Sequence, residues 1–147
     1  MMRILMSINR SRLLAISIGI VYLWFGFLKF FPALSPAEDL AKHTIGFLTF
    51  GWIPENTGYI ILALMEVAIG LCLVFNFQLK IIISIAILHL IFAFIPVLFF
   101  PEVSFTNAPF ALTLVGQYIV KNIIIISALF FIYPTGNYTN NNYIKNL

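Results

Sequence analysis

The sequence predicts an all-α fold: an integral membrane four-helix bundle with a short interfacial helix between its first and second membrane spans. Three observations support this prediction. The chain of 147 residues is 62% hydrophobic and only 9% charged, whereas an ordinary soluble domain carries about 25% charged residues. It contains four apolar runs, each close to the length of about 20 residues that crosses the hydrocarbon core of a bilayer. The segments between these runs are short, which leaves little sequence for a soluble module.

The four spans are expected within one domain, residues 1–134, at about 13–31, 57–77, 79–99 and 110–133. The first span follows an arginine-containing segment and so resembles a secretory signal. It is too long for such a signal, and no small-residue cleavage site follows it, so we expect the span to be retained. The polar, Asn-rich tail at 135–147 is expected to be disordered.

The connection between the first and second spans predicts a short surface helix. Ser35, Pro36 and Glu38 follow the order of an N-cap, a first-turn proline and the acidic residue of a capping box. Apolar residues recur after them at helical spacing, so this helix is expected to lie on the membrane surface. Gly51 and Pro54 mark its end.

Pro96 interrupts the third span. Proline removes a backbone hydrogen bond, so Pro96 predicts either a kink or the end of the regular helix. The segment that follows, with Pro101 and Pro109, is expected to be a loop before the fourth span.

The distribution of basic residues predicts the orientation of the chain in the membrane. The side of both termini carries Arg3, Arg10, Arg12, Lys80 and Lys145, whereas the opposite side carries Lys42. By the positive-inside rule, both termini are expected in the cytoplasm. The net charge of +3 comes from few residues, so it bears on orientation and gives no reason to expect a nucleic-acid partner.

Several functional classes lack the residues they need. Cys72 is the single cysteine, which excludes an internal disulfide and any CxxC pair. His43 and His89 are the only histidines, so no metal site is predicted from ligand spacing. The chain also lacks phosphate-binding and nucleophile motifs, so no soluble enzyme class is supported.

Ionisable residues inside the spans form the candidate site. Glu66 lies near the midpoint of the second span, where a charged side chain costs about 2.5 to 3.5 kcal/mol. At a rise of 1.5 Å per residue, His89 and Lys121 fall at a similar depth in the third and fourth spans. We therefore predict Lys121 as the partner of Glu66, with His89 second. Lys29 lies farther out, and its long stem could reach the same cluster or extend to the interface.

These residues support two interpretations. In the first, the ion pair is structural, and neighbouring polar groups complete its hydrogen bonds. In the second, the same groups line a cavity for a polar head group, such as that of a quinone, or form a proton relay, because ionisable residues within membranes usually mark function. The candidate ligand-binding or polar-cluster residues are Glu66, Lys121, His89, Gln117, Lys29 and Asn122.

Four segments together resemble the DoxX-like family of small bacterial membrane proteins: YLWFGFLKFFP in the first span, SPAEDL after it, EVAIGL in the second span and GQYIVKN in the fourth. The resemblance implies a four-helix bundle in the cytoplasmic membrane. The family's polar motif positions correspond here to Lys29, Glu66, Lys121 and Asn122. The family is similar to the small subunit of a thiosulfate:quinone oxidoreductase, and other relatives work in oxidative-stress complexes or in resistance to reactive chlorine.

The resemblance leads us to expect an accessory subunit of a membrane redox or oxidative-stress system without independent catalytic activity. No cofactor signature is evident, and a quinone is the candidate ligand. The expected partners are the lipid bilayer and a membrane or soluble oxidoreductase subunit, and a homo-oligomer is compatible with the sequence. Two alternatives remain: a small proton-coupled transporter, and a structural or chaperone-like membrane protein.

Overall fold

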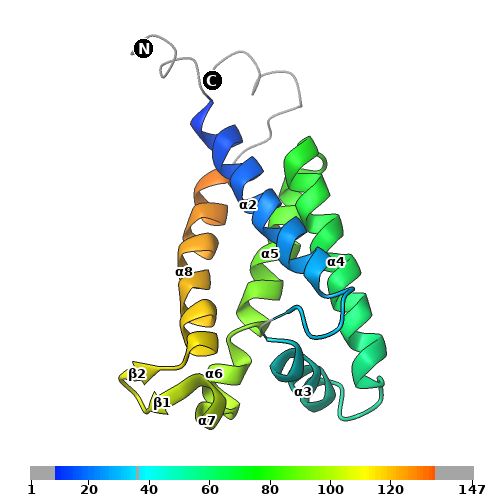
Figure 1. The fold of residues 1–147 in the computed structure, drawn as a ribbon. Coiled ribbons are helices and arrows are strands. Elements are labelled where there is room, and N and C mark those ends of the chain that lie inside the picture. Colours follow the sequence, from blue (N-terminus) through cyan, green and yellow to red (C-terminus); the bar gives the residue numbers. More distant parts are fainter. Residues whose placement is uncertain (1–8, 36, 135–147) are drawn as a thin grey trace.

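The computed structural model describes residues 9–35 and 37–134. Helices hold 74% of the described residues, and the elements follow one another as drawn in Figure 1. The predicted disordered tail, 135–147, lies outside the described residues.

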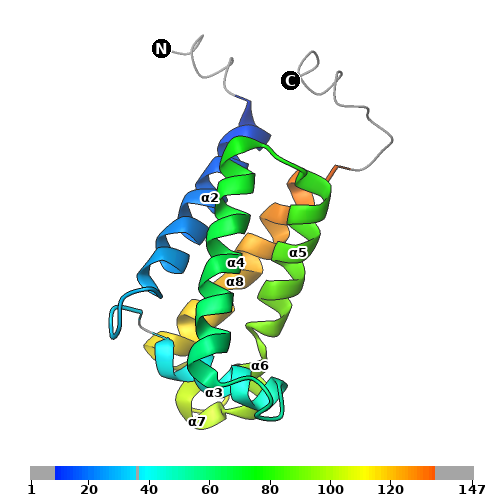
Figure 2. The same ribbon diagram turned by 90° about the vertical axis from the view of Figure 1, so that its right-hand side faces the viewer.

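Four stretches of helix are long and apolar enough to cross a membrane, as predicted. They are α2 (Arg10–Leu28), α4 (Glu55–Phe75), α5 (Leu79–Phe92) together with α6 (Ile95–Phe99), and α8 (Leu114–Ile132). The start of α2, the turn between α4 and α5 and the end of α8 lie at one end of the bundle, which we call the terminal end (Figures 1 and 2). The opposite end is called the hairpin end.

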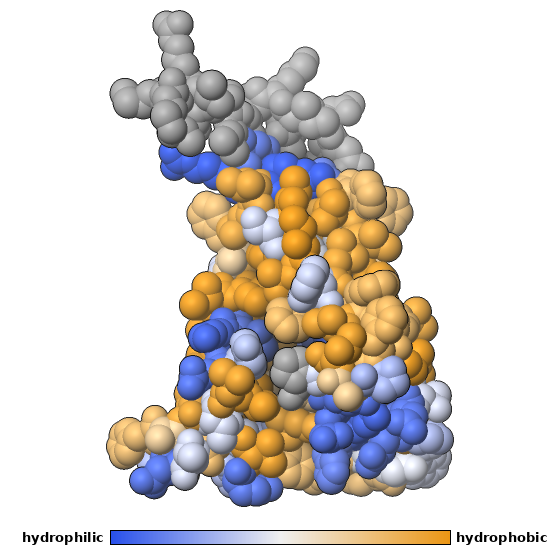
Figure 3. Space-filling model, viewed as in Figure 1, coloured by the Kyte–Doolittle hydropathy of each residue, from blue (hydrophilic) through white to orange (hydrophobic). Residues whose placement is uncertain are grey.

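The surface between these ends is apolar. Figure 3 shows a hydrophobic band on one face of the molecule, between more hydrophilic surfaces at the two ends. Large apolar side chains of all four long helices are exposed, among them Trp24, Leu64, Leu88 and Ile124. Extended exposed apolar surface marks contact with lipid or with a protein partner, and helices satisfy their backbone hydrogen bonds internally, as a bilayer requires.

Glycines bring α2 and α4 close together. A Cβ atom placed on Gly70 would lie 2.8 Å from the carbonyl oxygen of Gly19, and one placed on Gly19 would lie 2.9 Å from the carbonyl oxygen of Gly70. Larger residues would force the two backbones apart, and small residues play this part in many membrane helix pairs. As Figure 1 shows, α2 crosses α4 obliquely.

Arg12 ties the start of α2 to the end of α4. Its guanidinium donates hydrogen bonds to the carbonyl oxygens of Leu73, at 3.0 Å, and of Val74. These carbonyls lie in the last turn of α4, where the helix dipole places partial negative charge and where carbonyls lack partners within the helix. One side chain thus caps α4 and fastens it to α2.

The interfacial helix α3 (Glu38–Leu48) begins differently from the prediction. Its N-cap is Ala37, and no side chain caps it, whereas the sequence predicted Ser35 in that role. Pro36, which belonged to that prediction, lies outside the described residues. The carboxylate of Glu38 turns back instead and accepts hydrogen bonds from the Ala33 N–H at 2.9 Å and from Lys42 at 2.7 Å.

The third apolar stretch is broken, which settles the question raised by Pro96. Regular helix ends at Phe92, Ala93 and Phe94 form a turn, and α6 begins at Ile95. Pro96 therefore sits in the first turn of a new helix, where its missing N–H costs no intrahelical hydrogen bond.

The predicted loop after α6 contains a short helix, α7 (Pro101–Ser104), and a two-stranded antiparallel hairpin, β1 (Phe105–Asn107) and β2 (Ala111–Leu112). The all-α prediction omitted these strands. The fourth span was also predicted to begin too early, at 110, because apolar residues of the hairpin resemble helix. It begins at Leu114, where the side chain of Thr113 accepts a hydrogen bond from the Gly116 N–H at 3.1 Å and caps the helix.

Candidate functional site

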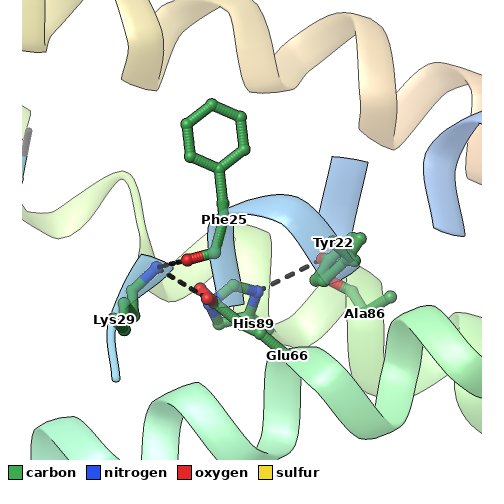
Figure 4. Close-up of polar contacts among 6 residues, drawn as sticks. All are labelled: Tyr22, Phe25, Lys29, Glu66, Ala86 and His89. Atoms are coloured by element: carbon green, nitrogen blue, oxygen red, sulfur yellow. Dashed lines mark hydrogen bonds and ion pairs between the residues drawn. The ribbon is translucent and has the colours of Figure 1, made fainter. Parts of the chain in front are cut away.

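Glu66 is buried in the middle of α4, and its partner is Lys29. Only 7% of Glu66 is exposed, and its Oε2 lies 2.6 Å from Nζ of Lys29. Lys29 is the C-cap residue of α2, and its ammonium also donates a hydrogen bond to the carbonyl oxygen of Phe25 at 3.4 Å (Figure 4). The ion pair therefore joins α2 to α4.

The other carboxylate oxygen of Glu66 faces α5. Its Oε1 lies 3.4 Å from Nε2 of His89, and Nδ1 of the same imidazole lies 3.2 Å from the hydroxyl oxygen of Tyr22. The Tyr22 hydroxyl is also 3.2 Å from the carbonyl oxygen of Ala86. Lys29, Glu66, His89 and Tyr22 thus form a continuous chain of polar contacts, the polar row, across three helices (Figure 4).

The polar row can hold its protons in two arrangements. The Tyr22 hydroxyl has one proton, which it donates either to Ala86 or to His89. If it donates to Nδ1 of His89, Nε2 carries the imidazole proton and donates to Glu66. If it donates to Ala86, Nδ1 must be the donor, and Nε2 can then donate to Glu66 only when the imidazole is doubly protonated.

Local sequence explains why the polar row forms here. Tyr22, Gly26 and Lys29 recur at helical spacing, so they share one face of α2. A Cβ atom on Gly26 would lie 3.0 Å from both the Cβ of Glu66 and the backbone nitrogen of Val67. The missing side chain at Gly26 lets this face of α2 approach α4 beside the carboxylate.

The predicted pairing of Glu66 with Lys121 is wrong. Within residues 9–35 and 37–134, Glu66 forms an ion pair with Lys29 and a polar contact with the imidazole of His89. Nζ of Lys121 lies instead 5.6 Å from the ring centroid of Tyr118, on its own helix. The prediction compared depths as though the helices were parallel, whereas α2 crosses α4 obliquely (Figure 1) and Lys29 at its end meets Glu66.

A cavity of about 430 Å³ adjoins the polar row, bounded by α2, α3, α4, α5, α6 and α8. Most of its lining is apolar. The polar side chains of the lining are Tyr22, Lys29, Ser35, Thr44, Glu66, His89, Tyr118, Lys121 and Asn122. This size, and a mostly apolar wall with a few convergent polar groups, are typical of sites for small molecules.

The predicted site residues divide into three groups. Lys29, Glu66 and His89 belong to the polar row, and Lys121 and Asn122 line the cavity on α8. Gln117 is exposed and does not line the cavity.

Sequence reasoning missed Tyr22, whose hydroxyl extends the polar row. Its position on the face of α2 that carries Lys29 was the available signal. It also missed Ser35 and Thr44, which line the cavity from α3 and the segment before it; their isolated hydroxyls gave no signal of their own.

A second ion pair lies on α3, the helix that covers one side of the cavity. Nζ of Lys42 is 2.7 Å from Oε1 of Glu38. The hydrogen bond from Lys42, together with that from the Ala33 N–H, lowers the pKa of the Glu38 carboxyl from its ordinary 4.5. The Lys42 ammonium also lies 5.3 Å from the ring centroid of Tyr59 on α4. The pair thus sits where α3 meets α4.

Comparisons of the chain with protein-family models, with curated proteins and with solved structures found no match. In the part of the chain that the structure describes, no three His, Cys, Asp or Glu side chains gather so that they could hold a metal ion. The features open to functional interpretation are thus the polar row and the cavity beside it.

Proposed function

We propose that this chain is a DoxX-like multi-pass protein of the cytoplasmic membrane, an accessory subunit of a membrane redox or oxidative-stress system that binds a quinone-like or other small ligand. The observation that carries the proposal is the cavity of about 430 Å³ beside the polar row. A structural ion pair needs no such space. The proposed orientation has both termini in the cytoplasm, because Arg10, Arg12 and Lys80 lie at the terminal end, whereas α3 at the hairpin end carries Lys42.

The chemistry of the cavity suits a quinone-like molecule. Apolar side chains such as Leu40, Leu62 and Ile125 form most of the wall and could pack against a ring or an isoprenoid tail. Lys29 and His89 lie at the wall and could donate hydrogen bonds to a ring carbonyl.

The proposal predicts that protein extracted gently from its native membrane retains a quinone. Ala41→Phe adds a ring to the cavity wall on α3 and should remove most of the bound quinone. His43→Phe places the same ring at an exposed position of the same helix and should leave occupancy unchanged. Occupancy is measured by chromatography and mass spectrometry of the extracted lipids. Equal quinone content in both variants would reject the cavity as the site.

The polar row and the accessory role need separate tests. Glu66→Gln keeps the shape of the side chain but removes its charge, so it should lower quinone occupancy. The occupancy of the Ala41→Phe variant is the reference for a blocked cavity.

Mild crosslinking in native membranes should recover an oxidoreductase subunit with the protein. Repeated recovery of this chain alone would count against the accessory role.

A second candidate function, proton-coupled transport, is favoured by the continuity of the polar row. Its two proton arrangements would let His89 pass a proton between Tyr22 and Glu66. In proteoliposomes, His89→Gln should then abolish a pH-driven flux that the wild-type protein supports. Absence of pH-driven flux of any tested solute through the wild-type protein would remove this candidate.

A further inference from the structure

Lys121 brings to the cavity a cation that no Asp or Glu side chain of the chain neutralises. All five acidic side chains of the chain lie in its described part: Glu38, Asp39, Glu55, Glu66 and Glu102. None of them has a carboxylate oxygen within 4.0 Å of Nζ of Lys121; Glu66 pairs with Lys29 and His89, and Glu38 pairs with Lys42. The polar row therefore leaves Lys121 over as an extra positive charge.

The position of Lys121 makes this positive charge costly unless an anion pairs with it. The residue is seven positions past the start of α8 at Leu114, which is about 10 Å along the helix. Intramembrane cations are expensive and normally pair with an anion or face a polar cavity. Lys121 is among the residues that line the cavity, and its side chain is exposed. The missing anion can thus come from a ligand.

The neighbours of Lys121 suit an oxyanion. The ring of Tyr118 holds the ammonium from one side through a cation–π contact, with Nζ 5.6 Å from the ring centroid. Asn122 follows on the same cavity wall and offers amide N–H donors. Apolar residues of α8, Ile119 and Ile125, line the cavity around this polar pair. The wall therefore combines a cationic point with a surface for a hydrocarbon chain.

We propose that the cavity takes an anionic amphiphile, whose carboxylate or phosphate pairs with Lys121 and Asn122 and whose hydrocarbon part lies along the apolar wall. This proposal rests on the proposed function, since it requires the cavity to be a ligand site. It further specifies that the ligand is negatively charged. The shared chemistry is an oxyanion on an apolar chain. A fatty acid and a lipid phosphate are two sources of that chemistry.

The test compares probes that differ only in the head group. Purified full-length protein in an uncharged detergent is titrated with palmitate, hexadecyl phosphate and hexadecanol, and binding is measured calorimetrically. At least one anion should bind about tenfold more tightly than the alcohol, as expected for a charge-assisted hydrogen bond. The preferred anion indicates whether a fatty acid or a lipid phosphate is the better fit.

Variants locate the preference. Lys121→Gln should bring the anion and hexadecanol to equal affinity, whereas Lys121→Arg, which keeps the charge, should retain most of the preference. Lys80→Gln removes a lysine from the first turns of α5, outside the cavity lining, and should change nothing. A preference for the anion that survives Lys121→Gln would overturn the proposed contact.

Measurements on the wild-type protein alone also decide the proposal. Equal affinity for the anions and hexadecanol would overturn it whatever the variants do. If a neutral quinone nevertheless binds to the wild-type protein and the Ala41→Phe variant fails to bind it, the proposed function stands and only the charge of the ligand is wrong. If neither quinone nor any of the three amphiphiles binds, the cavity is not a ligand site and both proposals fail.

Discussion

At the scale of single residues, the ion pair of Lys29 and Glu66 depends on the absence of a side chain at Gly26. Gly26 lets α2 approach until a Cβ there would lie 3.0 Å from that of Glu66. The long stem of Lys29 then reaches back from the end of its helix to the carboxylate, 2.6 Å away. The backbone approach and the ion pair are therefore one arrangement.

This assignment predicts strong energetic coupling between Lys29 and Glu66. Lys29→Met leaves a buried carboxylate without its cation, which should cost about 3 to 5 kcal/mol of unfolding free energy. Adding Glu66→Leu removes the unpaired charge, so the double variant should be more stable than the sum of the single effects predicts, with a coupling energy of about 0.5 to 3 kcal/mol. Unfolding in mixed micelles of rising SDS content measures the cycle.

The matched control replaces Lys121 by Met together with Glu66→Leu. Because no ion pair joins Lys121 to Glu66, the two effects should add. Strong coupling in this second cycle, and weak coupling in the first, would restore Lys121 as the partner and contradict the pairing described above.

The sequence identified part of the site because its residues stand out from their surroundings. Glu66 and His89 are conspicuous inside apolar helices, and their depths predicted that they could meet. The partner of Glu66 could not be chosen in this way. Whether Lys29 or Lys121 comes within reach of the carboxylate depends on the angle at which the helices cross. That angle is set by contacts between helices, such as that of Gly19 with Gly70. Their proximity is visible only in the structure.

At the scale of elements, α3 matters because it closes one side of the cavity. Leu40, Ala41 and Thr44 line the cavity from this helix. The carboxylate of Glu38 joins Lys42 to the backbone N–H of Ala33, a residue in the left-handed region at φ 63°. One carboxylate thus holds the first turn of α3 to the segment before it.

The lowered pKa of Glu38 predicts that α3 loosens in acid. A carboxyl whose pKa is lower in the folded state stabilises that state above its ordinary pKa of 4.5. This stability is lost as the pH falls through the lower folded value. As the pH falls below 4.5, amides of α3 should exchange hydrogen progressively faster, after correction for intrinsic rates, in hydrogen-exchange mass spectrometry.

In the Glu38→Gln variant, the amides of α3 should exchange hydrogen faster than in the wild-type protein already at pH 7. Their exchange rate, corrected for intrinsic rates, should then depend little on further acidification. Asp39→Asn alters the neighbouring acid, which makes no ion pair within the described residues, and should behave like the wild-type protein. Acid dependence that persists in Glu38→Gln would assign the effect to another group.

Element boundaries show where local sequence was insufficient. The four long helices could be predicted from apolar length alone. The start of α3 could not, because the Glu38 carboxylate accepts hydrogen bonds from the earlier Ala33 N–H and the later Lys42 and so takes no part in a capping box. The hairpin β1–β2 was hidden because its apolar residues continue the hydrophobic run of α8. Only the cap at Thr113, held also to the carbonyl oxygen of Val103 at 2.7 Å, marks the true start.

At the scale of the whole molecule, the even number of long apolar helices places the start of α2 and the end of α8 at the same end (Figure 1). The hairpin end holds α3, α7 and the β-hairpin. With the apolar surface between them, the two ends would face opposite sides of a bilayer.

The proposed orientation predicts the result of reporter fusions. Green fluorescent protein fused after Leu147 should fluoresce, and alkaline phosphatase at the same position should be inactive, because that position is expected in the cytoplasm. Alkaline phosphatase inserted after Asn107, in the hairpin, should be active. Phosphatase activity at Leu147 with none at Asn107 would mean that the orientation is reversed.

The contact between Arg12 and the last carbonyls of α4 also bears on the order of assembly. Arg12 lies at the start of α2, and Leu73 and Val74 lie at the end of α4. In a bilayer, this contact can form only after both helices have crossed and the chain has returned to the side where it began. Arg12 can therefore join the first two crossings only once the second is complete, and the contact itself needs neither α5 nor α8.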